Sequence, residues 1–292
     1  MKSLNSAYIK SSIFLLIVSL NLLLSCSNEK PESKVKNDLD KVGLKGKIKT
    51  LNETEYQASD KFGDIQKGNI QYKFITIYNE SGNTLEWRMY DSDGNQYSKV
   101  IYEYDNNRKI IEKKQFHEEN INSRTTYKYD EKGMKIESDD YKSDGSLESK
   151  YLFSYDEQGN ISEMKHYDKA GNLVSNNIGK YDENGSIIET TYYKLDGSID
   201  SKATEKYDVK GNKLESTFLD LDKPPESKNI FKYDDSGKLI EETESFGGSV
   251  SIATYRYEKF DKFGNWLIKL QEGELIRNLY KNTITEREIE YY

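Results

Sequence analysis

The sequence has little of what most catalytic and metal centres are made from. Its 292 residues include one Cys and only two His, His117 and His166. A single Cys excludes an intramolecular disulfide framework and a thiolate zinc cluster. Hydrophobic residues make up 35% of the chain, below the roughly 45–50% typical of globular domains. We therefore expect neither an ordinary aliphatic core nor a metal or cofactor site.

The charge balance also excludes one class of partner. The chain carries 43 basic and 51 acidic side chains, a formal net charge of −8. Nucleic-acid binding usually leaves a basic patch or stripe, so we expect no nucleic-acid partner. What the sequence has in abundance is tyrosine, with 24 residues.

The N-terminal segment 1–25 reads as a signal peptide. Lys2 and Lys10 precede an apolar run over 13–24, the pattern of a secretory signal that is too short for a stable membrane span. The run ends in Leu23-Leu24-Ser25-Cys26, which resembles the lipobox of bacterial lipoproteins. The resemblance implies cleavage after Ser25 and lipidation of Cys26. An ordinary secretory signal is the alternative.

Two further segments follow from this interpretation. Residues 26–41 are polar and lack periodicity, as in a flexible tether, and residues 42–292 form a single β-repeat domain. We expect the acyl chains to hold the protein to a membrane. Ser27, rather than Asp, suits sorting to the outer membrane, so the expected location is the cell envelope, on its periplasmic or surface side.

A repeat of about 26 residues dominates the rest of the chain. Its leader is an aromatic residue, usually followed by Asp and, four positions after the aromatic, by Gly; Arg108 takes the place of one Gly. Successive leaders are 26, 25, 26, 26, 26, 26 and 27 residues apart. They are Tyr78, Tyr104, Tyr129, Tyr155, Tyr181, Tyr207, Tyr233 and Phe260.

Each repeat predicts β-hairpins. An Asp side chain can accept hydrogen bonds from amides ahead of it, and Gly tolerates the left-handed conformation of a type I turn with a G1 bulge. Segments of about eight residues between turns alternate in polarity, as at 151–155. Beyond the signal, we expect no helix except a short turn near 34–41.

The expected fold is all-β: a long antiparallel meander of roughly sixteen to eighteen short strands. Open sheets rarely exceed about ten strands without curling or splitting. The ribbon can stay extended, or it can coil and enclose its Tyr-rich face. Low aliphatic content favours an extended or partly curled sheet. Segment 44–63 and segment 284–292 depart from the repeat and are expected to cap its two ends.

The Tyr-Asp-x-x-Gly pattern over about 70–266 resembles the YD repeats of RHS-type proteins, whose antiparallel strips curl into shells. The chain lacks the self-cleaving protease segment and toxin tip of that family, so the resemblance implies neither activity. With its lipobox, the whole chain also resembles repeat lipoproteins of Bacteroidota-type envelopes.

Few residues suggest chemistry of their own. Asp91, Asp93 and Asn95 have part of the spacing of a calcium loop, but turn formation explains them better. The two His have no paired nucleophile, and solvated strand positions explain them better. We expect Trp266 to cover an end of the sheet.

The tyrosine leaders are the candidate binding residues. Exposed rings offer stacking faces to sugars or peptides, although cross-strand packing is the favoured explanation for them. We expect a non-catalytic protein that presents a sheet surface to a protein or glycan. The alternative is a structural or immunity-type component that acts on a partner encoded nearby. The candidate stacking residues are Tyr129, Tyr155, Tyr181, Tyr207 and Tyr233.

Overall fold

A computed structural model describes residues 37–61, 64–222, 226–273, 275 and 282–292. In these residues one short helix precedes eighteen antiparallel strands, which confirms the expected all-β meander. The elements are α2 (Asp38–Lys41), β1 (Ile48–Lys61), β2 (Asp64–Tyr78), β3 (Thr84–Tyr90), β4 (Gln96–Tyr104), β5 (Ile110–His117), β6 (Asn120–Tyr129), β7 (Lys135–Lys142), β8 (Leu147–Tyr155), β9 (Ile161–Asp168), β10 (Leu173–Tyr181), β11 (Ile187–Tyr193), β12 (Ile199–Tyr207), β13 (Lys213–Asp220), β14 (Ser227–Tyr233), β15 (Leu239–Phe246), β16 (Ser249–Phe260), β17 (Trp266–Gly273) and β18 (Thr283–Tyr291).

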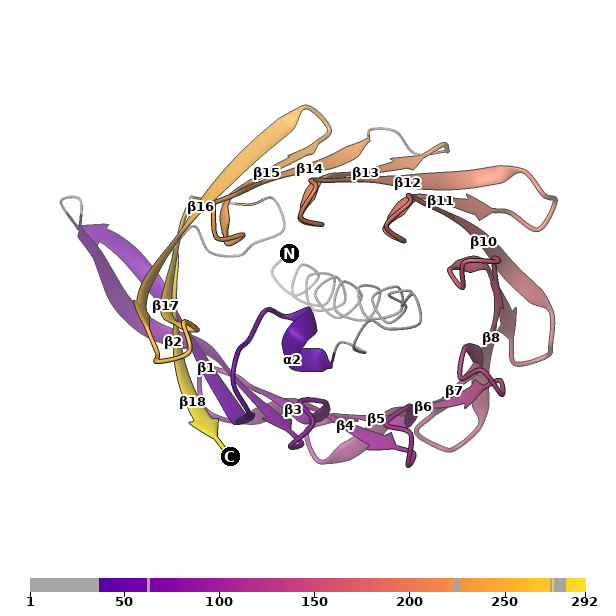
Figure 1. The fold of residues 1–292 in the computed structure, drawn as a ribbon, viewed down its shortest axis with the longest axis horizontal. Coiled ribbons are helices and arrows are strands. Elements are labelled where there is room, and N and C mark those ends of the chain that lie inside the picture. The colour runs from indigo at the N-terminus through magenta and orange to yellow at the C-terminus, as the bar shows by residue number, and fades with distance from the viewer. Residues whose placement is uncertain (1–36, 62–63, 223–225, 274, 276–281) are drawn as a thin grey trace, which may run out of the picture.

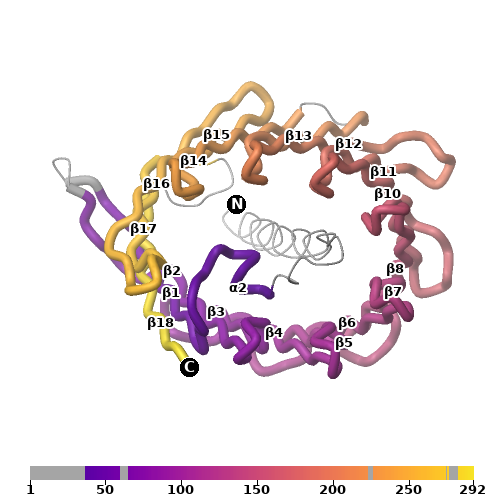
Figure 2. Tube along the Cα trace, in the orientation of Figure 1, coloured from indigo at the N-terminus to yellow at the C-terminus, as the bar shows by residue number. Residues whose placement is uncertain are grey.

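The sheet is closed, so the expectation of an extended or partly curled ribbon is wrong. Each strand pairs with the next, and β1 pairs with both β2 and β18. The strands form an oval ring when viewed along its axis (Figures 1 and 2). The two segments expected to cap opposite ends, 44–63 and 284–292, instead meet each other along β1 and β18.

Closure has a physical cause that the composition did not reveal. A sheet edge leaves a row of backbone N–H and C=O groups unpaired, and closing the sheet removes both edges. This gain comes from backbone hydrogen bonds and not from aliphatic burial. The ring therefore needs no Leu- and Val-rich interior, and many of the buried side chains are Ser, Thr, Gln and Asn.

The turns carry the hydrogen bonds that the sequence predicts. At 156–160, the Asp156 Oδ1 atom accepts from the amide of Gln158 at 3.0 Å and from that of Asn160 at 2.8 Å. Gly159 adopts a φ of 84°, which a residue without Cβ accepts at no steric cost. The strand register shifts at Tyr155, as expected of a bulge beside the turn.

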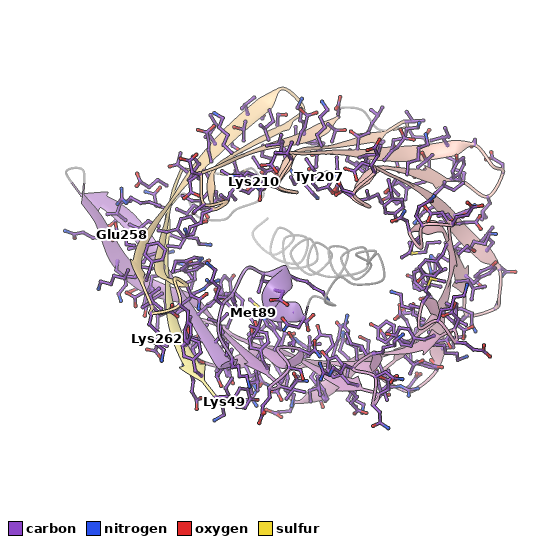
Figure 3. All side chains as sticks on the ribbon, in the orientation of Figure 1. Lys49, Met89, Tyr207, Lys210, Glu258 and Lys262 are labelled. Atoms are coloured by element: carbon purple, nitrogen blue, oxygen red, sulfur yellow. The ribbon has the colours of Figure 1, made fainter. Side chains whose placement is uncertain are left out.

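The ring has two chemically different faces, because side chains alternate along each strand. Figure 3 shows Met89 on the inner side of the ring and Lys49 and Glu258 on the outer side. In β16, for example, Tyr255 and Tyr257 are half-buried on the inner side, whereas the intervening Arg256 is exposed. We call these two surfaces the inner face and the outer face.

Ion pairs cover much of the outer face. Glu137, in β7, lies between Lys128 at 2.6 Å and Lys150 at 2.9 Å. These lysines hold the pKa of the Glu137 carboxyl at about 2, mainly through their hydrogen bonds to it. Glutamates at the same position of later hairpins are paired with lysines as well; they are Glu163, Glu189, Glu215 and Glu241.

The first and last strands meet at the seam, which we define as β17, β18, β1 and β2; strands β3 to β16 are the repeat wall. A small aliphatic cluster closes one end of the seam. Its residues are Leu39, Leu44, Ile48, Leu51 and Tyr78, with Ile289 and Tyr291 packed against them.

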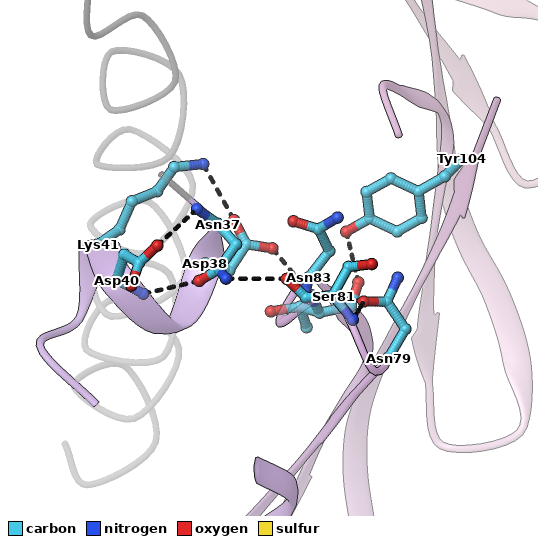
Figure 4. Close-up of polar contacts among 9 residues, drawn as sticks. Asn37, Asp38, Asp40, Lys41, Asn79, Ser81, Asn83 and Tyr104 are labelled. Carbon is cyan, nitrogen blue, oxygen red and sulfur yellow. Dashed lines mark hydrogen bonds and ion pairs between the residues drawn. The ribbon is translucent and has the colours of Figure 1, made fainter. Parts of the chain in front are cut away.

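Helix α2 lies inside the ring outline (Figure 1) and rests on the turn between β2 and β3. Asn37 caps the helix and donates from Nδ2 to the Ser81 carbonyl at 2.8 Å, and the Thr84 amide donates to Asp38 at 2.8 Å (Figure 4). Residues 37–41, assigned above to the end of the tether, therefore contact the sheet.

Three sequence predictions lie outside the described residues: the signal peptide, lipidation at Cys26, and tether residues 26–36. They stay predictions. In the described part of the chain, no helix is long and apolar enough to cross a membrane.

Candidate functional site

The five candidate tyrosines lie at the ends of β6, β8, β10, β12 and β14, where each is half-buried. In four of them the hydroxyl donates to a backbone oxygen at the start of the preceding strand. Tyr207 differs, because its hydroxyl donates to Glu205. The four backbone bonds are Tyr129 to Ile110 (2.8 Å), Tyr155 to Lys135 (2.6 Å), Tyr181 to Ile161 (3.0 Å) and Tyr233 to Lys213 (2.8 Å).

These bonds give the tyrosines a structural role. Each hydroxyl satisfies a backbone carbonyl next to a turn and so joins two neighbouring hairpins. Burial also favours the neutral phenol: it raises the pKa of Tyr233, so this hydroxyl stays protonated and able to donate. Stacking of these rings on a ligand stays a prediction.

The other residues singled out from the sequence are separated along the ring. The His166 ring stacks on that of Tyr151 at 4.5 Å, and burial lowers the pKa of His166. His117 is bonded to the Tyr97 carbonyl at 3.0 Å. The Asp91 carboxylate accepts from the amides of Asp93 and Asn95, as a turn residue does.

The inner face of the seam holds a buried ion pair. Arg287, in β18, donates from Nε to Glu53 of β1 at 2.9 Å, and only 13% of the arginine side chain is exposed. The Arg287 guanidinium also lies over the Trp266 ring, at 3.3 Å from its centre. A stacked and paired guanidinium is well satisfied even with little water around it. Trp266 therefore belongs to the inner face of the seam.

Two further charged residues, which form no ion pair with each other, lie two positions along these strands. Lys269 of β17 and Glu55 of β1 both face Thr285 of β18 in the pairing register. Burial lowers the pKa of Lys269 and raises the pKa of Glu55. Each group is thus held where its charged form is costly, a condition more common at functional sites than elsewhere.

Aromatic rings flank these charges on both sides. On the β16 side, the Tyr257 ring lies 5.6 Å from that of Trp266, and its pKa is raised to about 12 by burial. On the β2 side, Phe74 pairs with Glu53 in register and stacks on Trp87 at 5.9 Å. Both tryptophans of the chain are therefore on the inner face near the seam.

Sequence reasoning missed this group. Glu53, Glu55, Lys269 and Arg287 lie outside the repeat, and only pairing across more than 200 residues brings β1 to β17 and β18. A usable signal was present in Glu53 and Glu55, which alternate along the segment expected to begin the sheet. In the described residues, no three His, Cys, Asp or Glu side chains gather as metal ligands.

No family model matches the chain, and no curated protein matches it. Several solved structures share a similar arrangement of strands. A porin-like protein from Bacteroides uniformis is similar with a TM-score of 0.46 and 12% identity, over 83% of this chain and 98% of that chain.

A porin-like protein from Bacteroides vulgatus is similar with a TM-score of 0.29 and 11% identity, over 84% of this chain and 98% of that one. The Photorhabdus luminescens Tc holotoxin pore, with a TccC3 mutation, is similar with a TM-score of 0.33 and 13% identity, over 76% of this chain and 13% of that chain. At such low identities and TM-scores, these similarities assign neither an activity nor a location to the chain.

Proposed function

We propose that the protein is a non-catalytic binding ring of the cell envelope, held to a membrane by acyl chains on Cys26, and that it binds a glycan or protein ligand on its inner face. The observation that carries the proposal is the division of the closed sheet into an ion-paired outer face and an inner face where aromatic rings and partly desolvated charges gather.

The outer face has the charged side chains of a surface that contacts water. Surfaces of strands that face lipid carry an apolar band flanked by aromatic residues, whereas this face carries rows of Lys–Glu pairs such as Lys206–Glu215 and Lys180–Glu189. A lipid anchor on Cys26 would hold such a ring at a membrane without embedding its strands.

The inner face suits ligand binding. Aromatic rings with nearby hydroxyl and amide groups are the usual lining of sites for sugars and peptides. The five leader tyrosines would contribute their rings to such a site, while the hydroxyls of four of them bond backbone carbonyls beside the turns. No acid–base pair with a nucleophile emerges from the described contacts, so we propose binding and not catalysis.

The binding proposal is tested with the purified full chain on a glycan array and a peptide array. Binding to one ligand class should be lost in Tyr155→Leu, which removes a ring, and kept in Tyr155→Phe, which removes only the hydroxyl bond to Lys135. Lys206→Gln, on the outer face, is the matched control and should bind as the wild type does. Blank arrays for the wild type would contradict the proposal.

The anchor is tested separately by metabolic labelling with palmitate. Cys26→Ala should abolish labelling and release the chain from membranes, because thioether attachment needs the thiol. Ser27→Ala is the control and should stay labelled. Persistent labelling of Cys26→Ala would show that the anchor prediction is wrong.

A further inference from the structure

The inner face of the seam contains two buried polar groups without a partner among the described residues. The Gln271 Nε2 and Thr285 Oγ1 atoms are fully shielded from solvent and make no hydrogen bond to any of those residues, and their side chains belong to residues only 8% and 5% exposed. An unmade hydrogen bond of this kind costs about 1–3 kcal/mol. Unsatisfied buried groups are rare enough in folded proteins to need an explanation.

Lys269 lies beside both groups. It precedes Gln271 by two positions on the same face of β17, and it is the direct register partner of Thr285 on β18. Arg287 has its own carboxylate in Glu53. Among the described residues, Lys269 has no such ion pair, and its ammonium instead lies 5.6 Å from the Trp266 ring and 5.9 Å from the Tyr255 ring.

All three side chains can donate hydrogen bonds to one acceptor group placed between them. The ammonium has three donors, the amide nitrogen has two, and the hydroxyl has one. A single carboxylate offers about four lone-pair sites and neutralises one cation. A doubly charged phosphate fits less well, because Arg287 is already paired and Glu55 lies nearby in the same row of the sheet.

The surroundings match a sugar ring. Tyr257 and Trp266 supply apolar ring surface, on which the C–H face of a sugar can pack. Thr283 and Gln57, which follow in the next register row, supply hydroxyl and amide groups. Glu55 adds a carboxyl whose proton is retained more readily than usual because of burial. Such a carboxyl can donate to a ligand oxygen as well as accept from a hydroxyl.

We propose that Lys269, Gln271 and Thr285 bind the carboxylate of an acidic sugar whose ring packs on Tyr257 and Trp266. The assignment rests on the proposed binding function and names its site and ligand class. It places the site on β17 and β18 of the seam and on the adjoining strand β16, which carries Tyr257, at a different place from the five leader tyrosines.

Calorimetric titration of the full chain with a short oligogalacturonate tests the proposal. Lys269→Met should weaken binding about tenfold or more, the loss expected for one hydrogen bond between charged groups. Thr285→Val should weaken it by a smaller factor. Lys113→Met is the matched control, since Lys113 is another inner-face lysine whose pKa is lowered by burial, and it lies on β5 of the repeat wall. It should bind as the wild type does.

A second measurement uses the unmutated side chains. NMR of the chain with ¹³C-methylated lysines follows the titration of each ammonium. Bound oligogalacturonate should raise the lowered pKa of Lys269 and leave that of Lys113 unchanged, because only Lys269 gains a carboxylate. This measurement tests whether Lys269 contacts the ligand carboxylate even if Lys269→Met does not fold.

Binding of other ligands distinguishes a failure of this site assignment from a failure of the proposed function. Equal affinity for a neutral galactan of the same length, or for a short peptide with a free C-terminal carboxylate, overturns the acidic-sugar assignment. If the acidic sugar does not bind but another glycan or peptide binds the inner face, this site is wrong and the proposed function stands. If nothing binds, both are wrong.

Discussion

The repeat wall and the seam hold their neighbouring strands together by different interactions. In the repeat wall, most turns are built on Asp and Gly, and tyrosine hydroxyls join neighbouring hairpins, as with Tyr155 and Lys135. Side-chain hydrogen bonds there span up to 28 residues, as between Lys194 and Asp222. In the seam, Glu53 meets Arg287 across 234 residues, and the Asn265 side chain bonds the backbone of Lys45 across 220.

The difference follows from loop entropy. Bringing distant segments together costs more conformational entropy than closing a short hairpin, so the seam needs side-chain interactions in addition to backbone pairing. It has an aliphatic cluster, a buried ion pair and stacked aromatic rings. The repeat wall relies on polar turns and exposed ion pairs. Stability should therefore be more sensitive to single substitutions in the seam.

The largest effect is expected from Arg287→Ala. It leaves the Glu53 carboxylate without its partner and removes the guanidinium from Trp266. Breaking a buried pair in this way costs about 3–5 kcal/mol. Lys206→Ala breaks an exposed pair with Glu215 in the repeat wall and should cost less than about 1 kcal/mol. Urea denaturation of both variants measures the difference, and equal losses would contradict the comparison.

Truncation of the aliphatic cluster comes next. Ile48 is fully buried, so Ile48→Ala should lower the free energy of unfolding by about 2–4 kcal/mol, through lost burial and the cavity left behind. Ile230→Ala is the control in the repeat wall, where that side chain is 39% exposed, and it should cost less than about 1 kcal/mol. Similar urea midpoints for the two variants would argue against a special role for the cluster.

The two regions also differ in how well the sequence predicts them. The hairpins of the repeat wall follow from local chemistry: Asp, Gly and alternation predict most of its turns and strands, and the upper limit of the expected strand count matches the eighteen strands of the described residues. Closure was not predictable in this way. The pairing of Thr54 with Glu286 has no local signal. Low aliphatic content predicts an open sheet only if enclosure depends on aliphatic burial, and here backbone pairing closes the sheet.

The candidate site shows the same division. The leader tyrosines were found because they repeat, and the structure gives their hydroxyls bonds to turns. Lys269 and Glu55 were missed because each occurs once, in an irregular segment, and becomes informative only when Thr285 lies between them.

A smaller effect of opposite sign is expected at one turn of the repeat wall. Arg108 has a φ of 65° where the other turns of this kind have Gly. The left-handed conformation costs a residue with a Cβ about 1–2 kcal/mol in the folded state. Gly avoids this cost, but part of the gain is offset because Gly loses more conformational entropy on folding. Arg108→Gly should therefore raise stability by about 0.5–1 kcal/mol. Asn107→Gly, at a position without positive φ, should not, and a thermal melt compares them.

The smallest effect is a difference in pH dependence between two glutamates. Lysines lower the pKa of Glu137 in the repeat wall to about 2, so its ion pairs stabilise the fold above pH 4.5, and the stabilisation is lost as pH falls towards 2. Glu137→Gln should thus cost about 0.5–1 kcal/mol at pH 7, since the side chains of its lysine partners are 62% and 34% exposed, and nothing well below its folded pKa.

Glu55 in the seam should behave in the opposite way. Burial raises its folded pKa above the unfolded value of 4.5, so the folded state binds more protons and stability falls as pH rises through the raised value. Glu55→Gln should therefore stabilise the protein at pH 7 and lose this advantage below pH 4.5. Urea midpoints measured from pH 3 to pH 8 give both curves. If both substitutions changed stability in the same direction at pH 7, Glu55 would not be desolvated in the seam, and the seam and the repeat wall would not differ in how they hold their carboxylates.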